Sequence, residues 1–291
     1  MSEFKKFHPI VIFLYFTFTI IFAIWLINPV NLLISFVCSF LYLFVINGKK
    51  AIKKVLLLAV PTIIVASFIN AAFNHEGITI LSYLPDGNPL TFESIIYGFL
   101  ASVMISSVFL YFSCFNELMT SDKYIYLFGK LMPSLSLILS MTLRFVPRFT
   151  CYFKNLMRYQ RNQDNKGNIK KIKIALKSVS ATTSWALENS IDTADSMKSR
   201  GFGIKRRTSY SIFKFTKRDL IILFFILIAG IYIIFGKVTG VIDYVYFPKI
   251  IVNKINPYVI SLYISHFLLC ILPIIIEVSE VIKWKFLKLK I

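Results

Sequence analysis

Six stretches of the chain are nearly long enough to cross a bilayer and contain no Asp, Glu, Lys or Arg. A transmembrane helix needs about 20 predominantly apolar residues, and repeated runs of this kind are not expected in a soluble domain. Apolar residues make up 57% of the chain, including 29 Phe, which also exceeds the share in a soluble protein. The runs are Ile10–Ile27, Val30–Ile46, Val55–Phe73, Ile95–Phe115, Leu220–Phe235 and Tyr258–Ile276. We therefore expect an all-α polytopic membrane protein with about six transmembrane helices, within a range of about five to seven.

The basic residues predict how these spans are oriented. With six spans and a cytoplasmic amino terminus, all but three of the 33 Lys and Arg fall in cytoplasmic segments, the exceptions being Lys237, Lys249 and Lys254. The short basic loop at residues 49–54 shows this bias most clearly. Because cytoplasmic loops carry the excess of Lys and Arg, both termini are expected in the cytoplasm. The chain then divides into transmembrane helices over 1–115, a cytoplasmic or interfacial region over 116–219, and transmembrane helices over 220–291.

The net charge of +19 does not indicate nucleic-acid binding. The basic residues flank apolar spans, where anionic lipid headgroups attract them, whereas nucleic-acid binders carry a basic face on a soluble fold. The four Cys and three His are dispersed, so neither a disulfide framework nor a metal site is expected. His266 lies within a span, where an ionisable residue is a functional candidate; the alternative is a neutral imidazole that hydrogen-bonds a neighbouring helix.

Two local patterns predict contacts. Gly98, Ser102 and Ser106 are spaced four apart on one face of the fourth span, and small residues at this spacing allow close helix approach, within the chain or to another membrane protein. The stretch 83–89 is rich in turn residues and is flanked by β-prone residues, which predicts a small outer hairpin of Ile78–Tyr83 with Leu90–Phe92.

The region over 116–219 predicts two long helices. Leu131–Val146 is apolar and is expected to be a kinked helix at the inner interface or a tilted extra span, ended by Arg144 and Pro147 and followed by a basic amphipathic helix over Thr150–Gln163. The second helix, Ile169–Ser199, has an apolar stripe of helical period. Gly201 at its end fits the left-handed position that stops a helix, which would leave Arg200 at an exposed tip able to enter an acidic groove of a partner.

Several motifs in this region resemble a known family. Asp195–Gly203, with Trp185-Ala186-Leu187-Glu188 upstream, resembles the second signature of the transmembrane T components of energy-coupling factor (ECF) transporters, and Leu143–Phe149 resembles the approach to the first. The resemblance covers most of the chain, including the segments 88–91 and 120–123. It names Arg144, Pro147, Glu188, Asp195 and Gly203 as supporting signature residues.

The resemblance implies a function without catalysis. Such a subunit has two cytoplasmic coupling helices, each tipped by an Ala-Arg-Gly-like triplet that docks on one of two ABC-type ATPase subunits. A separate small membrane protein, the S component, captures a vitamin or a metal ion, and the complex lies in the bacterial cell membrane. The second triplet is matched by Ser199-Arg200-Gly201. The place of the first triplet is taken by Gln160-Arg161-Asn162, in which the arginine is kept but the residues on either side of it differ from the family pattern.

The residues themselves agree with a non-enzymatic subunit that has no cofactor. The chain has no Gly-x-x-x-x-Gly-Lys-Ser/Thr loop for ATP phosphates and no His-Glu-x-x-His or Gly-x-Ser-x-Gly motif. Two alternatives from other classes remain open. A self-sufficient permease or channel would need ionisable residues along its path, for which His266 is the candidate. A membrane-bound lipid transferase would need an acidic metal motif, for which Glu188, Asp192 and Asp195 are the candidates.

Overall fold

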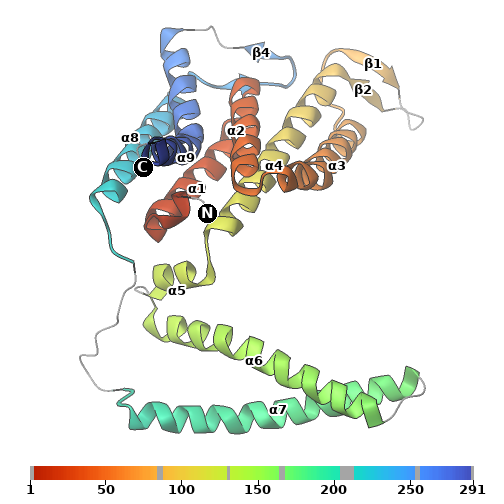
Figure 1. The fold of residues 1–291 in the computed structure, drawn as a ribbon. Helices are drawn as coiled ribbons and strands as arrows, with labels where there is room; N and C mark the ends of the chain where they lie inside the picture. Colours follow the sequence, from red (N-terminus) through yellow and green to blue (C-terminus); the bar gives the residue numbers. More distant parts are fainter. Residues whose placement is uncertain are drawn as a thin grey trace. The chain divides into compact units, whose positions relative to one another are not determined.

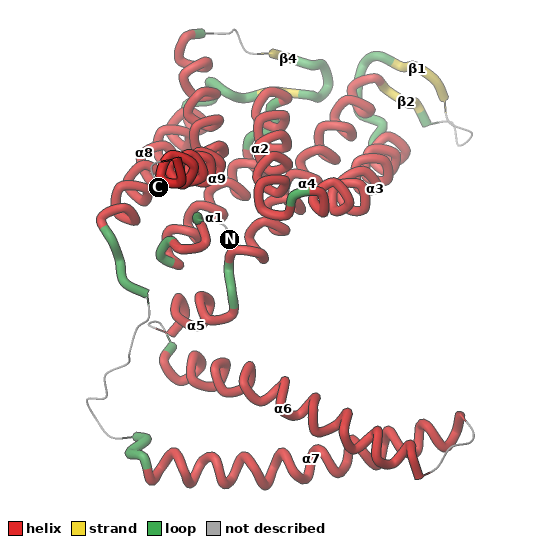
Figure 2. The backbone as a smooth tube through the Cα atoms, in the orientation of Figure 1, coloured by secondary structure: helices red, strands yellow, loops and turns green. Residues whose placement is uncertain are grey.

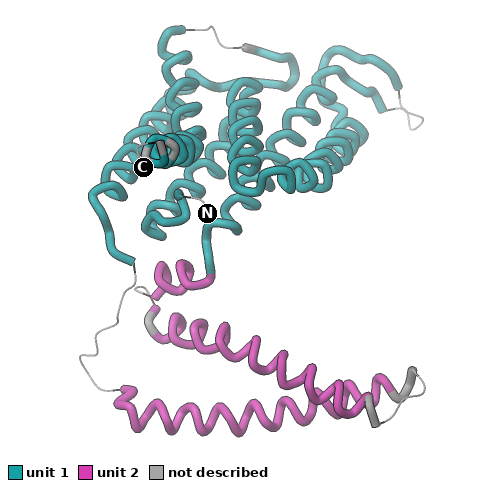
Figure 3. Tube along the Cα trace, viewed as in Figure 1, with its two compact units in different colours: residues 1–120, 213–291 teal, residues 121–212 magenta. Residues whose placement is uncertain are grey.

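The computed structural model describes residues 3–83, 88–129, 132–163, 168–203, 213–252 and 256–289. The described chain is predominantly helical and contains two small antiparallel hairpins (Figures 1 and 2). It divides into two compact units, here called the bundle unit (residues 1–120 and 213–291) and the hairpin unit (residues 121–212) (Figure 3). Together with the apolar helices below, this confirms the expectation of an all-α polytopic membrane protein.

The bundle unit contains the apolar helices. Within the part of the chain that the structure describes, five of them are long and apolar enough to cross a membrane: α2, α3, α4, α8 and α9. A sixth, α1, has 17 residues, the lower limit for a span. The bounds of the elements are η1 (Phe4–Lys6), α1 (Pro9–Trp25), α2 (Pro29–Asn47), α3 (Lys49–Phe73), β1 (Ile80–Tyr83), β2 (Pro89–Thr91), α4 (Phe92–Leu118), α8 (Lys217–Val238), β3 (Tyr244–Val245), β4 (Ile251–Val252) and α9 (Pro257–Leu289).

The start of α2 explains why α1 is shorter than the expected run Ile10–Ile27. Asn28 accepts a hydrogen bond from the backbone N–H of Val30 and caps α2, and Pro29 occupies its first turn. An N-cap residue has a non-helical backbone, and the residue before Pro is disfavoured in the helical region. Helix α1 therefore ends at Trp25, before this turn.

The sequence predicts a basic loop at residues 49–54, but in the structure this segment is helical. Helix α3 begins at Lys49, directly after Gly48, which has a φ of 55°. A single glycine with a positive φ therefore separates α2 from α3, and the four Lys lie on the first two turns of α3. Lys54 Nζ reaches Glu117 Oε1 on α4 at 2.7 Å.

Polar side chains connect the helices of the bundle unit. His266 Nε2 of α9 lies 3.0 Å from Ser35 Oγ of α2, and both residues are buried. This contact matches the interpretation of His266 as a packing residue that hydrogen-bonds a neighbouring helix. Tyr15 of α1 donates to the carbonyl of Cys270 in α9 at 3.1 Å, and Asn28 donates to Tyr263 at 2.8 Å.

Small residues bring α3 and α4 together, as the stripe predicted. Ser106 Oγ lies 2.8 Å from Thr62 Oγ1 and donates to the carbonyl of Ala59 at 3.3 Å. At Gly98, an added Cβ would lie 3.0 Å from Cβ of Asn70 and 3.2 Å from the backbone oxygen of Ser67. The stripe is therefore used for packing inside the chain.

The predicted pairing of Ile78–Tyr83 with Leu90–Phe92 in a hairpin is confirmed. Strands β1 and β2 pair antiparallel, with Ile80 opposite Thr91, and the turn residues 84–87 lie outside the described residues. Glu93, at the start of α4, accepts hydrogen bonds from the backbone N–H and the hydroxyl of Thr79 at 3.3 and 2.7 Å. The second hairpin, β3 with β4, was not predicted; Tyr246 near it donates to the carbonyl of Ile27 at 2.8 Å.

A valine at position 98 tests the contact between α3 and α4. Gly98→Val should lower the free energy of unfolding in detergent by about 1–3 kcal/mol, because the added atoms overfill a tight helix contact. Phe99→Val, a change on the neighbouring side chain that is 51% exposed, should cost less than about 0.5 kcal/mol. Equal losses in the two variants, measured by denaturant titration, would contradict this close contact.

Candidate functional site

The hairpin unit carries every residue that the sequence singled out for coupling. It consists of α5 (Ser121–Gly129), α6 (Pro133–Gln163) and α7 (Asn168–Ser199). Helix α6 is one continuous helix, so the predicted break after Val146 is wrong, and it is not among the helices that could cross a membrane. Pro147 lies inside α6, on an exposed face of the helix. Helix α7 matches its predicted bounds within one residue.

Helices α6 and α7 form an antiparallel pair that meets around Trp185. The indole of Trp185 stacks on Tyr152 with ring centroids 4.2 Å apart and packs edge-on against Phe149 at 5.7 Å. The guanidinium of Arg148 lies 5.3 Å from the centre of the same ring. The two stretches that resemble the family signatures, Leu143–Phe149 and Trp185–Glu188, are therefore in direct contact.

A hydrogen bond near the connection adds a second link. Ser178 Oγ of α7 donates to Gln160 Oε1 of α6 at 3.2 Å, and Ser178 is fully buried. The sequence had suggested Gln160 as a docking residue, but its side chain is engaged within the hairpin unit. Arg161 next to it is exposed, and the side chain of Asn162 lies outside the described residues, as does the turn 164–167.

The end of α7 is closed as predicted from Gly201. This residue has a φ of 82°, its N–H donates to the carbonyl of Lys198 at 3.0 Å, and the N–H of Phe202 donates to the carbonyl of Met197 at 3.0 Å. These two bonds form a Schellman motif, which satisfies the last carbonyls of the helix. The backbone conformation around Arg200 is therefore fixed by these two hydrogen bonds.

Arg200 itself is exposed, and so are Ser199 on one side and Asp195 one turn earlier. Asp195 Oδ1 lies 3.9 Å from Lys198 Nζ, and both side chains are at least 70% exposed, so this pair adds little stability. Ser199 Oγ donates to the carbonyl of Ser196 at 2.9 Å. A planar guanidinium at such a helix end can bind a carboxylate of a partner with two parallel hydrogen bonds.

The remaining signature residues lie on exposed faces. Arg144 is exposed on α6, Glu188 is exposed on α7, and Gly203 follows the helix with a φ of 98° and open space where a Cβ would be. Among the described residues, no group of three His, Cys, Asp or Glu side chains is placed to hold a metal ion.

Arg161 at the end of α6 and Arg200 just after the end of α7 are far apart in the helix pair. Gln160 contacts Ser178, and 21 residues separate Ser178 from Ser199, so Arg161 and Arg200 are roughly 30 Å apart along the helix at about 1.5 Å per residue. They lie toward opposite ends of the helix pair because the two helices run antiparallel (Figure 2).

The hairpin unit also presents apolar side chains. Along α6 and α7 the exposed fraction of the aliphatic side chains named below is between 41% and 65%. The predicted stripe of α7 is thus present, but much of it is exposed. The exposed apolar residues are Leu135, Ile138, Leu139, Leu143, Val146, Ile172, Leu176, Val179, Leu187 and Ile191.

Sequence reasoning missed the ring cluster and the Gln160–Ser178 bond. A signal for the cluster existed, because Phe145, Phe149 and Tyr152 recur at helical spacing and so share one face of α6. No sequence signal pointed to Ser178. No protein-family model matches this chain, and no curated protein matches it. The resemblance to ECF T components therefore remains a hypothesis that rests on the residues quoted above.

Trp185 should hold the two helices together. Trp185→Ala removes two aromatic contacts worth about 0.5–1.5 kcal/mol each and one cation–π contact worth about 0.5–1 kcal/mol. Amide hydrogen exchange in residues 148–160 and 178–185 should accelerate about tenfold or more. The matched variant Leu187→Ala changes a side chain that is 63% exposed and should leave exchange within about twofold. Unchanged exchange in Trp185→Ala would show that the cluster does not join the helices.

Proposed function

We propose that this chain is the transmembrane coupling subunit of an ECF-type importer. In this proposal the hairpin unit lies in the cytoplasm and receives motion from two ABC-type ATPase subunits. The bundle unit stays in the cell membrane, and a separate S component binds the vitamin or metal ion that is imported. The chain itself catalyses no reaction, and selectivity for the cargo resides in the S component.

The observation that carries this proposal is the end of α7. The signature-like segment ends in a Schellman motif at Gly201, and Arg200 is exposed on the residue before it. A rod of 32 residues with a fixed, cationic tip can transmit a displacement applied at that tip. An unstructured loop carrying the same arginine would absorb the displacement instead.

Two further observations support the proposal. The exposed apolar residues of α6 and α7 provide a surface for a hydrophobic partner or for the inner leaflet, as an S component or a bilayer would require. Arg161 and Arg200 are separate exposed cations, which suits two ATPase subunits rather than one.

The alternatives receive less support. His266, on which a permease would depend, is buried and hydrogen-bonded to Ser35. Glu188, Asp192 and Asp195, on which a lipid transferase would depend, lie exposed along one helix rather than around a common point.

Charge reversal at the tip of α7 tests the coupling role. Arg200→Glu should reduce co-purification of the ATPase subunits of the same organism at least tenfold, because the variant places a carboxylate against an acidic groove. Lys198→Glu is a matched control, since Lys198 is exposed, lies two residues earlier and undergoes the same change of charge. Normal ATPase assembly with Arg200→Glu, in protein that is normally inserted in the membrane, would count against the proposal.

The first triplet should contribute less. Arg161→Glu should weaken ATPase association by a smaller factor than Arg200→Glu, because Gln160 beside it bonds Ser178 and is not available to a partner. Transport assays of the double variant Arg161→Glu/Arg200→Glu should show complete loss of uptake. Wild-type uptake by this double variant would exclude the model of two docking tips.

A further inference from the structure

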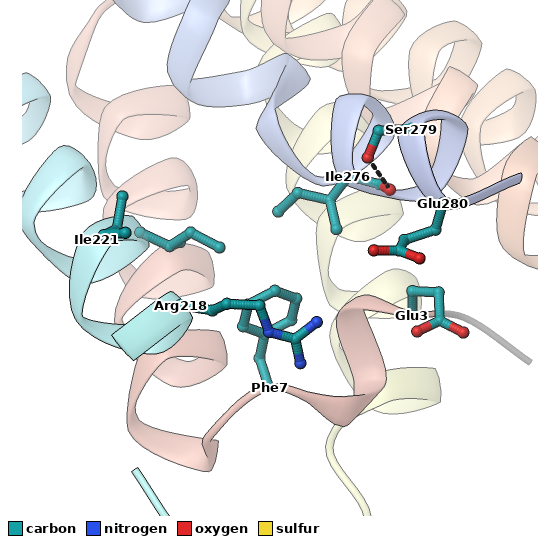
Figure 4. A pocket seen from close by; sticks show the side chains of 8 residues that line it. Glu3, Phe7, Arg218, Ile221, Ile276, Ser279 and Glu280 are labelled. Atoms are coloured by element: carbon teal, nitrogen blue, oxygen red, sulfur yellow. Dashed lines mark hydrogen bonds between the residues drawn. The ribbon is translucent and has the colours of Figure 1, made fainter. Parts of the chain in front are cut away.

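A pocket of about 240 Å³ lies in the bundle unit where the amino-terminal segment meets the start of α8 and the late part of α9. Figure 4 shows the guanidinium of Arg218 on one side of it and the carboxylates of Glu3 and Glu280 on the other. Isoleucines 221, 222 and 276 form its apolar part. Neither the proposed coupling function nor the sequence accounts for this combination of groups.

The wall of the pocket is fixed by two buried carboxylates. Glu277 of α9 accepts hydrogen bonds from the backbone N–H groups of Glu3 and Phe4 at 2.9 and 3.1 Å. Asp219 of α8 accepts from the backbone N–H of His8 at 3.1 Å and also caps α8 through Thr216. Charge-assisted bonds of this kind are about twice as strong as neutral ones, so residues 3–8 are held firmly between α8 and α9.

Arg218 is positioned over this wall. Its guanidinium lies 5.2 Å from the centre of the Phe7 ring, and among the described residues it forms no ion pair. Five N–H donors are thus available on a cation whose position is set by an aromatic face. A phosphate is the anion that such a fork binds well.

The carboxylates opposite are only partly used. Glu3 Oε1 lies 2.6 Å from Lys6 Nζ, and Glu280 Oε1 lies 3.2 Å from Lys283 Nζ. Both lysines are more than half exposed, so these pairs are weak, and no hydrogen bond among the described residues occupies either Oε2 atom. The pocket therefore offers acceptors for a cationic donor as well as the guanidinium of Arg218.

The pocket lies where the apolar parts of α8 and α9 end, which for membrane-spanning helices corresponds to the headgroup region. Arg218 precedes Leu220, where the apolar part of α8 begins, and Glu280 follows Ile276, where the apolar run of α9 ends. Ile221 is 67% exposed and continues the apolar side of the pocket along the surface of α8. A ligand here would have its polar part in the pocket and its apolar part along lipid-facing helices.

We propose that this pocket binds the headgroup of phosphatidylethanolamine. The phosphate is bound by Arg218, the primary ammonium is bound by Glu3 and Glu280, and the acyl chains extend along Ile221. An anionic phosphatidylglycerol headgroup has no cation to satisfy the two carboxylates. Phosphatidylcholine has a quaternary ammonium that donates no hydrogen bond to them.

Native mass spectrometry of the full-length protein in detergent, titrated with each of the three lipids, tests this assignment. The wild type should retain phosphatidylethanolamine at least fivefold better than phosphatidylcholine or phosphatidylglycerol. Arg218→Gln should lose this retention at least fivefold, while Arg218→Lys should keep part of it. Lys217→Gln is the matched control, because Lys217 is exposed one residue earlier and does not line the pocket, and it should bind like the wild type.

A second variant tests the ammonium side. Glu3→Gln/Glu280→Gln should lose the preference for phosphatidylethanolamine over phosphatidylcholine, because Gln has no charge to attract the ammonium. Equal retention of the three lipids by the wild type, a preference for phosphatidylglycerol, or wild-type retention by Arg218→Gln would each overturn the proposal. Thermal unfolding of each variant within about 2 °C of the wild type confirms that a loss of lipid does not reflect misfolding.

Discussion

The bundle unit is governed by the absence of hydrogen-bond partners in hydrocarbon. Every backbone N–H and C=O within a bilayer has to be satisfied inside the protein, which is why the charge-free runs form helices. The same constraint applies to polar side chains, and the structure directs them to neighbouring helices: Ser35 to His266, Tyr15 to the carbonyl of Cys270, and Thr62 to Ser106. Each such bond contributes only about 0.6 kcal/mol on average, with a maximum of about 1.7 kcal/mol. Their larger effect is to specify which helices are neighbours, because a wrong pairing would leave the same groups unsatisfied.

The hairpin unit follows different rules. Its two long helices are joined by a cluster of rings around Trp185 and by the bond between Ser178 and Gln160, while many of its apolar side chains remain exposed. A pair of helices that buries so little of its apolar surface internally depends on what it contacts. At its far end, the Schellman motif at Gly201 makes the last turn of α7 well defined in spite of this exposure. A rigid tip on a surface that needs partners is the combination that a force-transmitting subunit requires.

Sequence patterns were sufficient where a local rule decides the structure. Charge-free runs located the apolar helices, Gly201 located the end of α7, and the turn residues at 83–89 located the hairpin of β1 and β2. Sequence patterns did not predict features that depend on contacts between residues far apart in the chain. Glu277 caps residues that lie more than 270 positions earlier in the chain, and no periodicity marks that pair. The engagement of Gln160 by Ser178 is likewise a contact between two helices, so the first triplet looked like a docking motif although one of its side chains is used internally. Pro147 was expected to end a helix, yet α6 continues through it on an exposed face.

The central claim is that the hairpin unit is in the cytoplasm, where ATPase subunits can reach it, and the native cysteines allow a direct test. Cys151 on α6 is exposed, whereas Cys38, Cys114 and Cys270 are buried in the bundle unit. A membrane-impermeant maleimide should therefore label Cys151 in inside-out membrane vesicles and leave it unlabelled in intact cells, with Cys151→Ser as the blank. Labelling of Cys151 in intact cells would place the hairpin unit on the outer side and contradict the coupling function.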